Sequence, residues 1–153
     1  MWNKKLSLLL SASLLAWGAH AQNRAPATVG AIGFVKTAKG ESFVDSGGQA
    51  VRAAEGTPLK VGDVVRTGAD GAVGLTLKDN TVMSFGPSTR FTLEEYLFAP
   101  AKGDLKLGGR LTSGSLHYVS GLIAKARPEA VAVKTPTGTI GVRGTRFVVV
   151  VAP

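Results

Sequence analysis

The sequence has no cysteine, two histidines and few aromatic residues (7%) among its 153 positions. Without cysteine, no disulfide can hold the fold together, and no thiolate can serve as a nucleophile or metal ligand. His20 lies near the N-terminus, which leaves His117 as the one histidine of the remaining chain. A zinc centre or a hydrolase triad needs more groups of this kind. The composition therefore argues against metal and nucleophile chemistry, and we expect no cofactor.

Long apolar runs are also lacking, apart from a short one near the N-terminus. Lys4 and Lys5 precede the apolar residues 6–17, and small residues follow up to Ala21. A membrane-spanning helix needs about 20 apolar residues, whereas this pattern is typical of a cleaved secretory signal peptide. An uncleaved anchor or a buried helix is the alternative. We predict a signal peptide over 1–21, no spanning segment after its cleavage, and a periplasmic or secreted location.

The net charge is +8, from 18 basic and 10 acidic residues. Basic charge of this size suits solubility or attraction to acidic polymers and lipid headgroups. The basic residues are dispersed, without a run of four or more and without interleaved aromatics, so we expect no nucleic-acid partner.

The chain after residue 29 has a β pattern. Val73, Leu75 and Leu77 alternate with small or polar residues, which indicates a strand with one buried face. Gly, Asp, Asn and Pro recur at short intervals, and 20 glycines supply many corners. We predict an all-β fold of many short strands in a single domain over 30–153, after a polar leader over 22–29.

A weak internal repeat bears on the arrangement of these strands. A strand–turn–strand pattern recurs near 73–85, 105–119 and 131–150, with Gly108 and Gly109 as a turn signal in the second copy. Stacked copies would form a β-solenoid-like fold. A β-sandwich explains the same pattern nearly as well, and both arrangements stay open.

Four residues are predicted to form turns: Gly62, Asp63, Asp79 and Asn80. Asn tolerates the left-handed conformation that glycine otherwise provides, so we expect the Asp79–Asn80 turn to form. The carboxylates of Asp63, Asp70 and Asp79 could bind calcium, but no ligand spacing recurs. Capping of turn N–H groups is therefore the preferred interpretation.

No catalytic constellation is found. Glu94 and Glu95 are adjacent in an expected strand, so we predict that they face opposite sides and form no acid/base pair. Gly138, Gly141 and Gly144 match neither a dinucleotide fingerprint nor a phosphate loop, and turns explain them better. We predict that the protein is not an enzyme.

The closing stretch, 133–149, reads as a strand, a Pro/Gly turn, a short strand, an Arg-Gly-Thr corner and a last strand. It resembles the signature of the FecR domain, and its motif residues are Thr135, Pro136, Gly138, Val142, Arg143, Gly144, Thr145 and Phe147. Similarity extends over 33–149, including 56–68 and 75–93, where Asn80 stands in for the usual turn glycine. The resemblance implies an exported binding or signalling module.

One departure limits what the resemblance implies. Regulators of this family carry a cytoplasmic anti-sigma segment and a spanning helix before the periplasmic part, where this sequence has the predicted signal peptide. We therefore expect only part of the family's mechanism to apply.

Within the motif, Arg143 has two possible roles. Its guanidinium could bridge two turns through carbonyl oxygens, which we prefer, or present a fork to an acidic partner group. Phe147 is predicted to anchor the core. The valines at 148–151 would make a hazardous exposed edge, so we expect them to pair inside the fold or to accept a partner's strand.

Two functions follow. The first is binding of another cell-envelope protein through a sheet edge, in envelope signalling. The alternative is a scaffold that binds peptidoglycan or acidic envelope polysaccharide through basic charge. Charge-led polymer binding should weaken steeply with salt, whereas strand addition should weaken little.

Overall fold

The computed structural model describes residues 30–152. The predicted signal peptide and the polar leader lie outside the described residues. Within them, no helix is long and apolar enough to cross a membrane.

Twelve strands and three short helical segments make up the described chain. The strands are β1 (Gly33–Lys39), β2 (Ser42–Ser46), β3 (Gln49–Arg52), β4 (Pro58–Leu59), β5 (Val64–Thr67), β6 (Ala72–Leu77), β7 (Val82–Phe85), β8 (Arg90–Ala99), β9 (Asp104–Val119), β10 (Val131–Thr135), β11 (Gly138–Gly141) and β12 (Arg146–Val151). The helical segments are η1 (Pro100–Lys102), α1 (Leu122–Ala126) and η2 (Pro128–Ala130).

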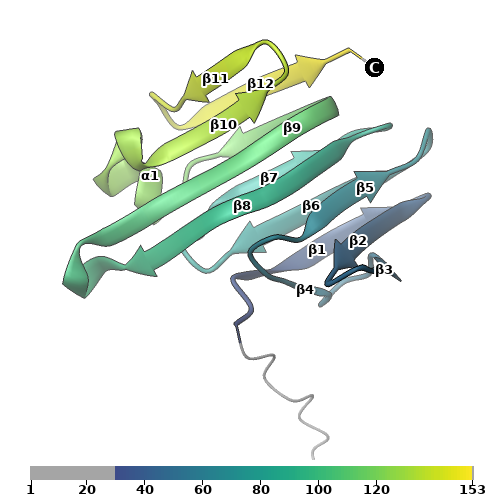
Figure 1. Ribbon diagram of the computed structural model, residues 1–153, viewed down its shortest axis with the longest axis horizontal. Coiled ribbons are helices and arrows are strands. Elements are labelled where there is room, and N and C mark those ends of the chain that lie inside the picture. The colour runs from purple at the N-terminus through teal and green to yellow at the C-terminus, as the bar shows by residue number, and fades with distance from the viewer. Residues whose placement is uncertain (1–29, 153) are drawn as a thin grey trace, which may run out of the picture.

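The strands form one curled sheet with two facing layers (Figure 1). The front layer runs β3-β2-β5-β8-β9-β10-β11, and the rear layer runs β4-β1-β6-β7-β9-β12. The strand β9 belongs to both layers, because its first part pairs with β8 and its last part with β7. Every pair is antiparallel except β9 with β10. The all-β, single-domain prediction is confirmed, and the antiparallel pairing favours the two-layer arrangement over stacked solenoid rungs.

The core lies between the layers and follows the alternation of the sequence. Val73, Leu75 and Leu77 of β6 are buried, as the period-two pattern predicts. Phe85 of the rear layer and Phe91 of the front layer meet across the core, with ring centroids 5.0 Å apart. Burial of one such ring stabilises the fold by about 2–3 kcal/mol, so these rings hold the two layers together.

The predicted internal repeat is wrong in its second copy. Residues 105–119 form one uninterrupted strand, the 16-residue β9, instead of a strand, a turn and a strand. Gly108 and Gly109 permit close packing and make no turn there. A Cβ on Gly109 would lie 2.1 Å from the Phe91 ring, and one on Gly108 would lie 2.9 Å from a Glu95 carboxylate oxygen. The strand bends at Gly114, whose φ is 86°.

The buried carboxylate of Asp79 fixes the start of α1. It accepts hydrogen bonds from the Thr81 hydroxyl (2.7 Å), the Tyr96 hydroxyl (3.2 Å) and the Ile123 N–H (3.2 Å). The backbone carbonyl of Asp79 accepts from the Leu122 N–H at 2.7 Å. The turn between β6 and β7, the strand β8 and the helix α1 are thereby tied to one residue.

The helix α1 makes possible the single parallel pair of the sheet. Because β10 runs parallel to β9, the chain must travel back along the sheet between them. The segments α1 and η2 make this return, and Val131 then pairs with Leu107. The position of β10, and of the two strands that follow it, depends on where α1 begins.

Substitution of Gly121 by alanine tests this anchor. A Cβ there would lie 2.3 Å from the Thr81 amide nitrogen and 2.4 Å from the Asp79 carbonyl oxygen, and both are backbone atoms. We expect Gly121→Ala to lower the free energy of unfolding by about 2 kcal/mol or more, measured by urea denaturation. The control is Gly138→Ala, because a Cβ on Gly138 meets nothing within 4 Å. Equal stability of the two variants would contradict the anchor.

Candidate functional site

The motif residues of the closing stretch come together at one end of the molecule, formed by β10, β11 and β12 (Figure 1). We call this region, residues 131–152, the open end. Thr135, Pro136 and Gly138 belong to the β10–β11 hairpin, and residues 142–147 form the corner and the start of β12. The predicted turn residues Gly62, Asp63, Asp79 and Asn80 lie before β5 and between β6 and β7.

The hairpin between β10 and β11 is tight. Thr135 pairs with Gly138, and the Thr135 hydroxyl donates a hydrogen bond to the Gly138 carbonyl oxygen (2.9 Å). Open space surrounds the Cα atoms of Gly138 and Gly141. Of the three regularly spaced glycines, only Gly144 has a positive φ, 115°. The corner therefore requires glycine at position 144 alone.

Ser120 fastens this corner to the end of β9. Its hydroxyl donates to the Gly144 carbonyl oxygen (2.9 Å), and its N–H donates to the Thr145 carbonyl oxygen (2.8 Å). The Arg143 side chain is exposed and makes no hydrogen bond or ion pair with any described residue. The turn-bridging role that the sequence favoured for Arg143 is thus performed by Ser120, which the sequence analysis missed. A lone serine after a strand carries no signal that would have revealed it.

Phe147 packs as predicted for a core anchor. Its ring stacks on Tyr118 of β9, with centroids 4.7 Å apart and planes inclined by 17°. Tyr118 is fully buried, and Phe147 is half-buried beside it. This stack fixes which face of β12 points inward.

One hydrogen bond shows which backbone groups of β12 bond to β9 and which point away from it. In an antiparallel pair, opposite residues alternate between hydrogen-bonded and non-bonded pairs. The Ser120–Thr145 bond belongs to the same register as the β9–β12 pairing. By this alternation, the residues that bond to β9 are Phe147, Val149 and Val151, and the residues whose N–H and C=O groups point away are Arg146, Val148 and Val150. No described strand pairs with that side of β12, which we call the free edge.

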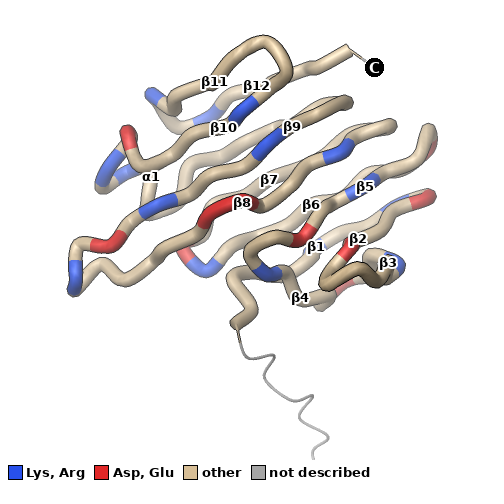
Figure 2. The backbone as a smooth tube through the Cα atoms, viewed as in Figure 1, with Lys and Arg blue, Asp and Glu red and all other residues tan. Residues whose placement is uncertain are grey.

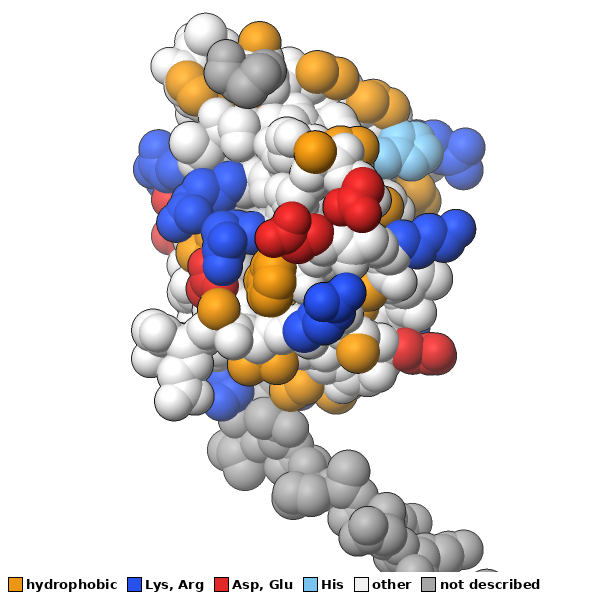
Figure 3. All heavy atoms as spheres, turned by 90° about the vertical axis from the view of Figure 1, so that its right-hand side faces the viewer, with side chains coloured by type: hydrophobic (Ala, Val, Ile, Leu, Met, Phe, Trp, Pro, Cys, Tyr) orange, Lys and Arg blue, Asp and Glu red, His pale blue; other side chains and the backbone are white. Residues whose placement is uncertain are grey.

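The side chains along the free edge are exposed, and after Arg146 they are apolar. Val148 and Val150 are 61% and 74% exposed, and both lie on the outer face of the rear layer. Val148 is in register with His117, which faces solvent opposite the buried Leu116. Figure 3 shows hydrophobic side chains along the upper right of the molecule, next to the histidine. The valines at 148–151 therefore pair inside the fold on one side and remain open on the other.

Two hollows lie at the open end, and residues of β12 line the smaller one. One, of about 270 Å³, lies between β11 and β12 and is lined by Ile140, Val149 and Val151 among others. The other, of about 720 Å³, lies beside the corner, and its lining includes Arg143, Glu129 and Val142. The space between the two layers is thus not fully closed at the open end.

Positive charge gathers around the open end (Figure 2). Residues 120–152 contain one acidic residue, Glu129, and five basic residues: Lys125, Arg127, Lys134, Arg143 and Arg146. Residues 30–119 are nearly balanced, with ten basic residues and nine acidic ones. Counting the charged residues of each segment would have revealed this uneven distribution of charge from the sequence. A search for runs of consecutive basic residues does not reveal it.

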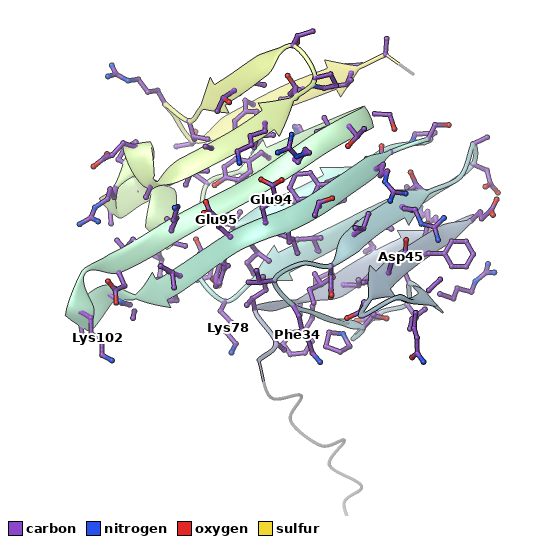
Figure 4. The ribbon with its side chains drawn as sticks, viewed as in Figure 1. Phe34, Asp45, Lys78, Glu94, Glu95 and Lys102 are labelled. Carbon is purple, nitrogen blue, oxygen red and sulfur yellow. The ribbon has the colours of Figure 1, made fainter. Side chains whose placement is uncertain are left out.

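The prediction that Glu94 and Glu95 face opposite sides is wrong. The register of β8 on β9 shifts between Leu93 and Glu95, and this bulge turns both carboxylates to the outer face (Figure 4). Glu95 pairs with Lys106 at 3.0 Å.

Ion pairing keeps Glu94 from acting as a proton donor. Its carboxylate contacts Arg110 (2.7 Å) and Lys134 (3.0 Å). The hydrogen bonds from Arg110 and then Lys134 lower the pKa of Glu94. A general acid needs a raised pKa, so Glu94 is poorly suited to that role.

The predicted turn residues bond to backbone groups. The Asp63 carboxylate accepts from the Lys60 N–H at 2.8 Å. Asn80 adopts the left-handed conformation with a φ of 65°, and Gly62 has a φ of 93°. No group of three or more potential metal ligands occurs within residues 30–152.

Comparison with protein families identifies the class of this chain. The model of the family described as FecR protein matches residues 63–152, so the chain belongs to that family. Members of this family are signalling regulators of the cell envelope, generally without catalytic activity. The match begins at Asp63, after the opening stretch where we also noted similarity. No curated protein and no solved structure matches the chain.

The alkaline stability of the protein tests the surroundings of Tyr118. Its buried hydroxyl makes no well-formed hydrogen bond with a described residue, although the Thr81 and Ser120 side chains lie near it. Burial raises the pKa of Tyr118 from 10.0 to about 12, against the smaller lowering effect of these two side chains. The neutral form is therefore favoured in the folded state, and stability present below pH 10 is lost as the pH rises toward 12. Because Phe leaves no unpaired hydroxyl, we expect Tyr118→Phe to raise the unfolding free energy by about 1 kcal/mol at neutral pH and to reduce the alkaline loss.

The measurement is urea denaturation at neutral pH and at about pH 11. The control is Tyr96→Phe, which should destabilise, because the Tyr96 hydroxyl bonds to both the N–H and the carboxylate of Asp79. A clear loss of stability in Tyr118→Phe at neutral pH would show that its hydroxyl is bonded.

Proposed function

We propose that this protein is an exported, non-catalytic module that binds another protein of the cell envelope by strand addition at the free edge, in envelope signalling. The observation that carries the proposal is the outward alternation of Arg146, Val148 and Val150 along β12. Their N–H and C=O groups form a ready template for an added strand. Main-chain hydrogen bonds supply the affinity in this mode of recognition.

The sequence of β12 supports this use of the edge. Soluble proteins usually blunt a free edge with lysine, proline, a bulge or a very short strand. The strand β12 has six residues, four of them consecutive valines, and its register on β9 is unbroken. An apolar edge of this kind is more stable when it is covered by a partner's strand than when it is exposed to water.

The strand β3, at the other end of the front layer, provides a comparison within the same chain. It also pairs on one side only, with β2, and it is short and exposed along its whole length. Its four residues include Gln49 and Arg52. The two edges therefore differ in length and polarity, and β12 has the features of a binding strand.

The alternative, binding of acidic envelope polymer such as peptidoglycan or polysaccharide, is supported by the positive charge at the open end. Attraction led by exposed charges falls steeply as salt is added. Strand addition, held by backbone bonds and apolar contacts, is far less sensitive to salt. The two functions therefore separate in one experiment.

Proline at the free edge should abolish partner capture without unfolding the protein. Proline removes a backbone N–H and is tolerated on edge strands, and the Val148 N–H points away from β9. We expect Val148→Pro to lose a protein that wild type captures by crosslinking in the periplasm at both low and high salt. The bait is the full exported chain.

Ala50→Pro is the matched control. The Ala53–Ser42 backbone bond sets the alternation on β2, which leaves the Ala50 N–H pointing away from that strand. This variant should capture the same protein as wild type. Recovery of cell-wall material alone, lost at high salt, would overturn strand addition and favour polymer binding.

A further inference from the structure

We infer that the segment received by β12 is extended and acidic, and that its carboxylates bind Arg146 and Arg143. This inference rests on the proposed function and specifies the partner's chemistry. It is carried by the charges that remain unpaired at the open end and by the shape of the groove beside β12.

Some of the basic residues in or beside the open end already pair with a glutamate and are not free to bind a partner's carboxylate. Lys134 is paired with Glu94 at 3.0 Å, and Arg127 lies 3.9 Å from Glu129. Arg143 and Arg146 are exposed and make no ion pair with any residue from 30 to 152. An Arg guanidinium presents a planar fork of donors that matches a carboxylate. The unpaired guanidinium groups of Arg143 and Arg146 therefore lie at the start of the free edge.

The position of Arg146 defines where the partner's carboxylate must lie. Side chains alternate along β12, and Phe147 points inward onto Tyr118. Arg146, Val148 and Val150 therefore share the outer face. In an added strand, the residue opposite Arg146 also faces outward, close enough for a cross-strand ion pair.

The side chains on the inner face of the added strand would enter the groove between β11 and β12, which carries no charged residue in its lining. The groove of about 270 Å³ between β11 and β12 is lined partly by Ile140, Val149 and Val151, which are half-buried. Thr135, Thr137 and Thr139 line the same groove, so uncharged side chains, apolar or hydroxyl-bearing, fit it better than charged ones. The expected partner segment carries uncharged residues on the groove side and an acidic residue on the outer side, opposite Arg146.

A second copy of this chain is disfavoured as the occupant. Two open ends brought together would place like charges side by side, which destabilises an interface. An acidic polymer satisfies the arginines but offers no alternating N–H and C=O groups to the free edge. The charge and the backbone together point to an acidic strand.

Short synthetic peptides test this chemistry on the full chain. One probe alternates valine with glutamate, and its counterpart alternates valine with lysine; both are end-blocked and labelled for anisotropy. We expect the glutamate peptide to bind at least tenfold more tightly. Arg146→Glu and Arg143→Glu should each weaken it by about fivefold to tenfold, and Val148→Pro should abolish binding.

Arg52→Glu is the control for charge, because Arg52 is an exposed residue of the distant edge strand β3. It changes the net charge by the same amount and should leave the affinity unchanged. Equal weakening by Arg52→Glu would show general attraction and overturn the assignment of Arg143 and Arg146.

The failure of this inference differs from failure of the proposed function. If both peptides bind equally and Val148→Pro still abolishes binding, the edge accepts strands with no preference for acidic residues. That result overturns the inference of an acidic partner and leaves the proposed function intact. If neither peptide binds while a protein is still captured at the edge in cells, an acidic extended segment is again overturned. If no protein is captured, the proposed function itself fails.

Discussion

The buried Asp79 carboxylate is the contact on which the open end depends. Four donors converge on it: the N–H and the hydroxyl of Thr81 in its own turn, the Tyr96 hydroxyl of β8 and the Ile123 N–H in the first turn of α1. Full burial makes the loss of any of them costly, because a buried polar group without hydrogen-bond partners is expensive inside a protein. Gly121 completes the contact, since any larger residue would collide with the backbone there. The helix α1 can therefore begin in one place only.

This anchor sets the geometry of the free edge in turn. The helix returns the chain so that β10 runs parallel to β9, and β11 follows in a tight hairpin. Ser120 then holds the corner so that β12 pairs with the last part of β9. Because β10 and β12 occupy different layers, the space between them stays open to one side. The position of the free edge is thus set by contacts in the interior of the fold.

The sequence predicted much of the fold because its strands alternate cleanly, as in β6, and because Asn80 and Gly62 mark real turns. The prediction from sequence was wrong at Gly108 and Gly109, where glycine allows close packing of the strand and makes no turn. It was wrong again at Glu94, where a bulge in β8 breaks the alternation of inward and outward side chains. The residues of the closing motif lie on the strands and corner that form the open end. The sequence marked residues 148–151 as a possible open edge, but it could not predict which of their backbone groups stay open. That phase depends on the long-range contact of Ser120 with Thr145, which no local pattern encodes.

The most direct test of the free edge is amide hydrogen exchange along β12 in the isolated protein, read residue by residue by NMR. Amides bonded within a sheet exchange slowly, whereas those open to water exchange fast. We expect slow exchange at Phe147, Val149 and Val151 and fast exchange at Arg146, Val148 and Val150. Uniformly slow exchange at all six amides would show that this edge is already paired, and would contradict a strand-accepting role.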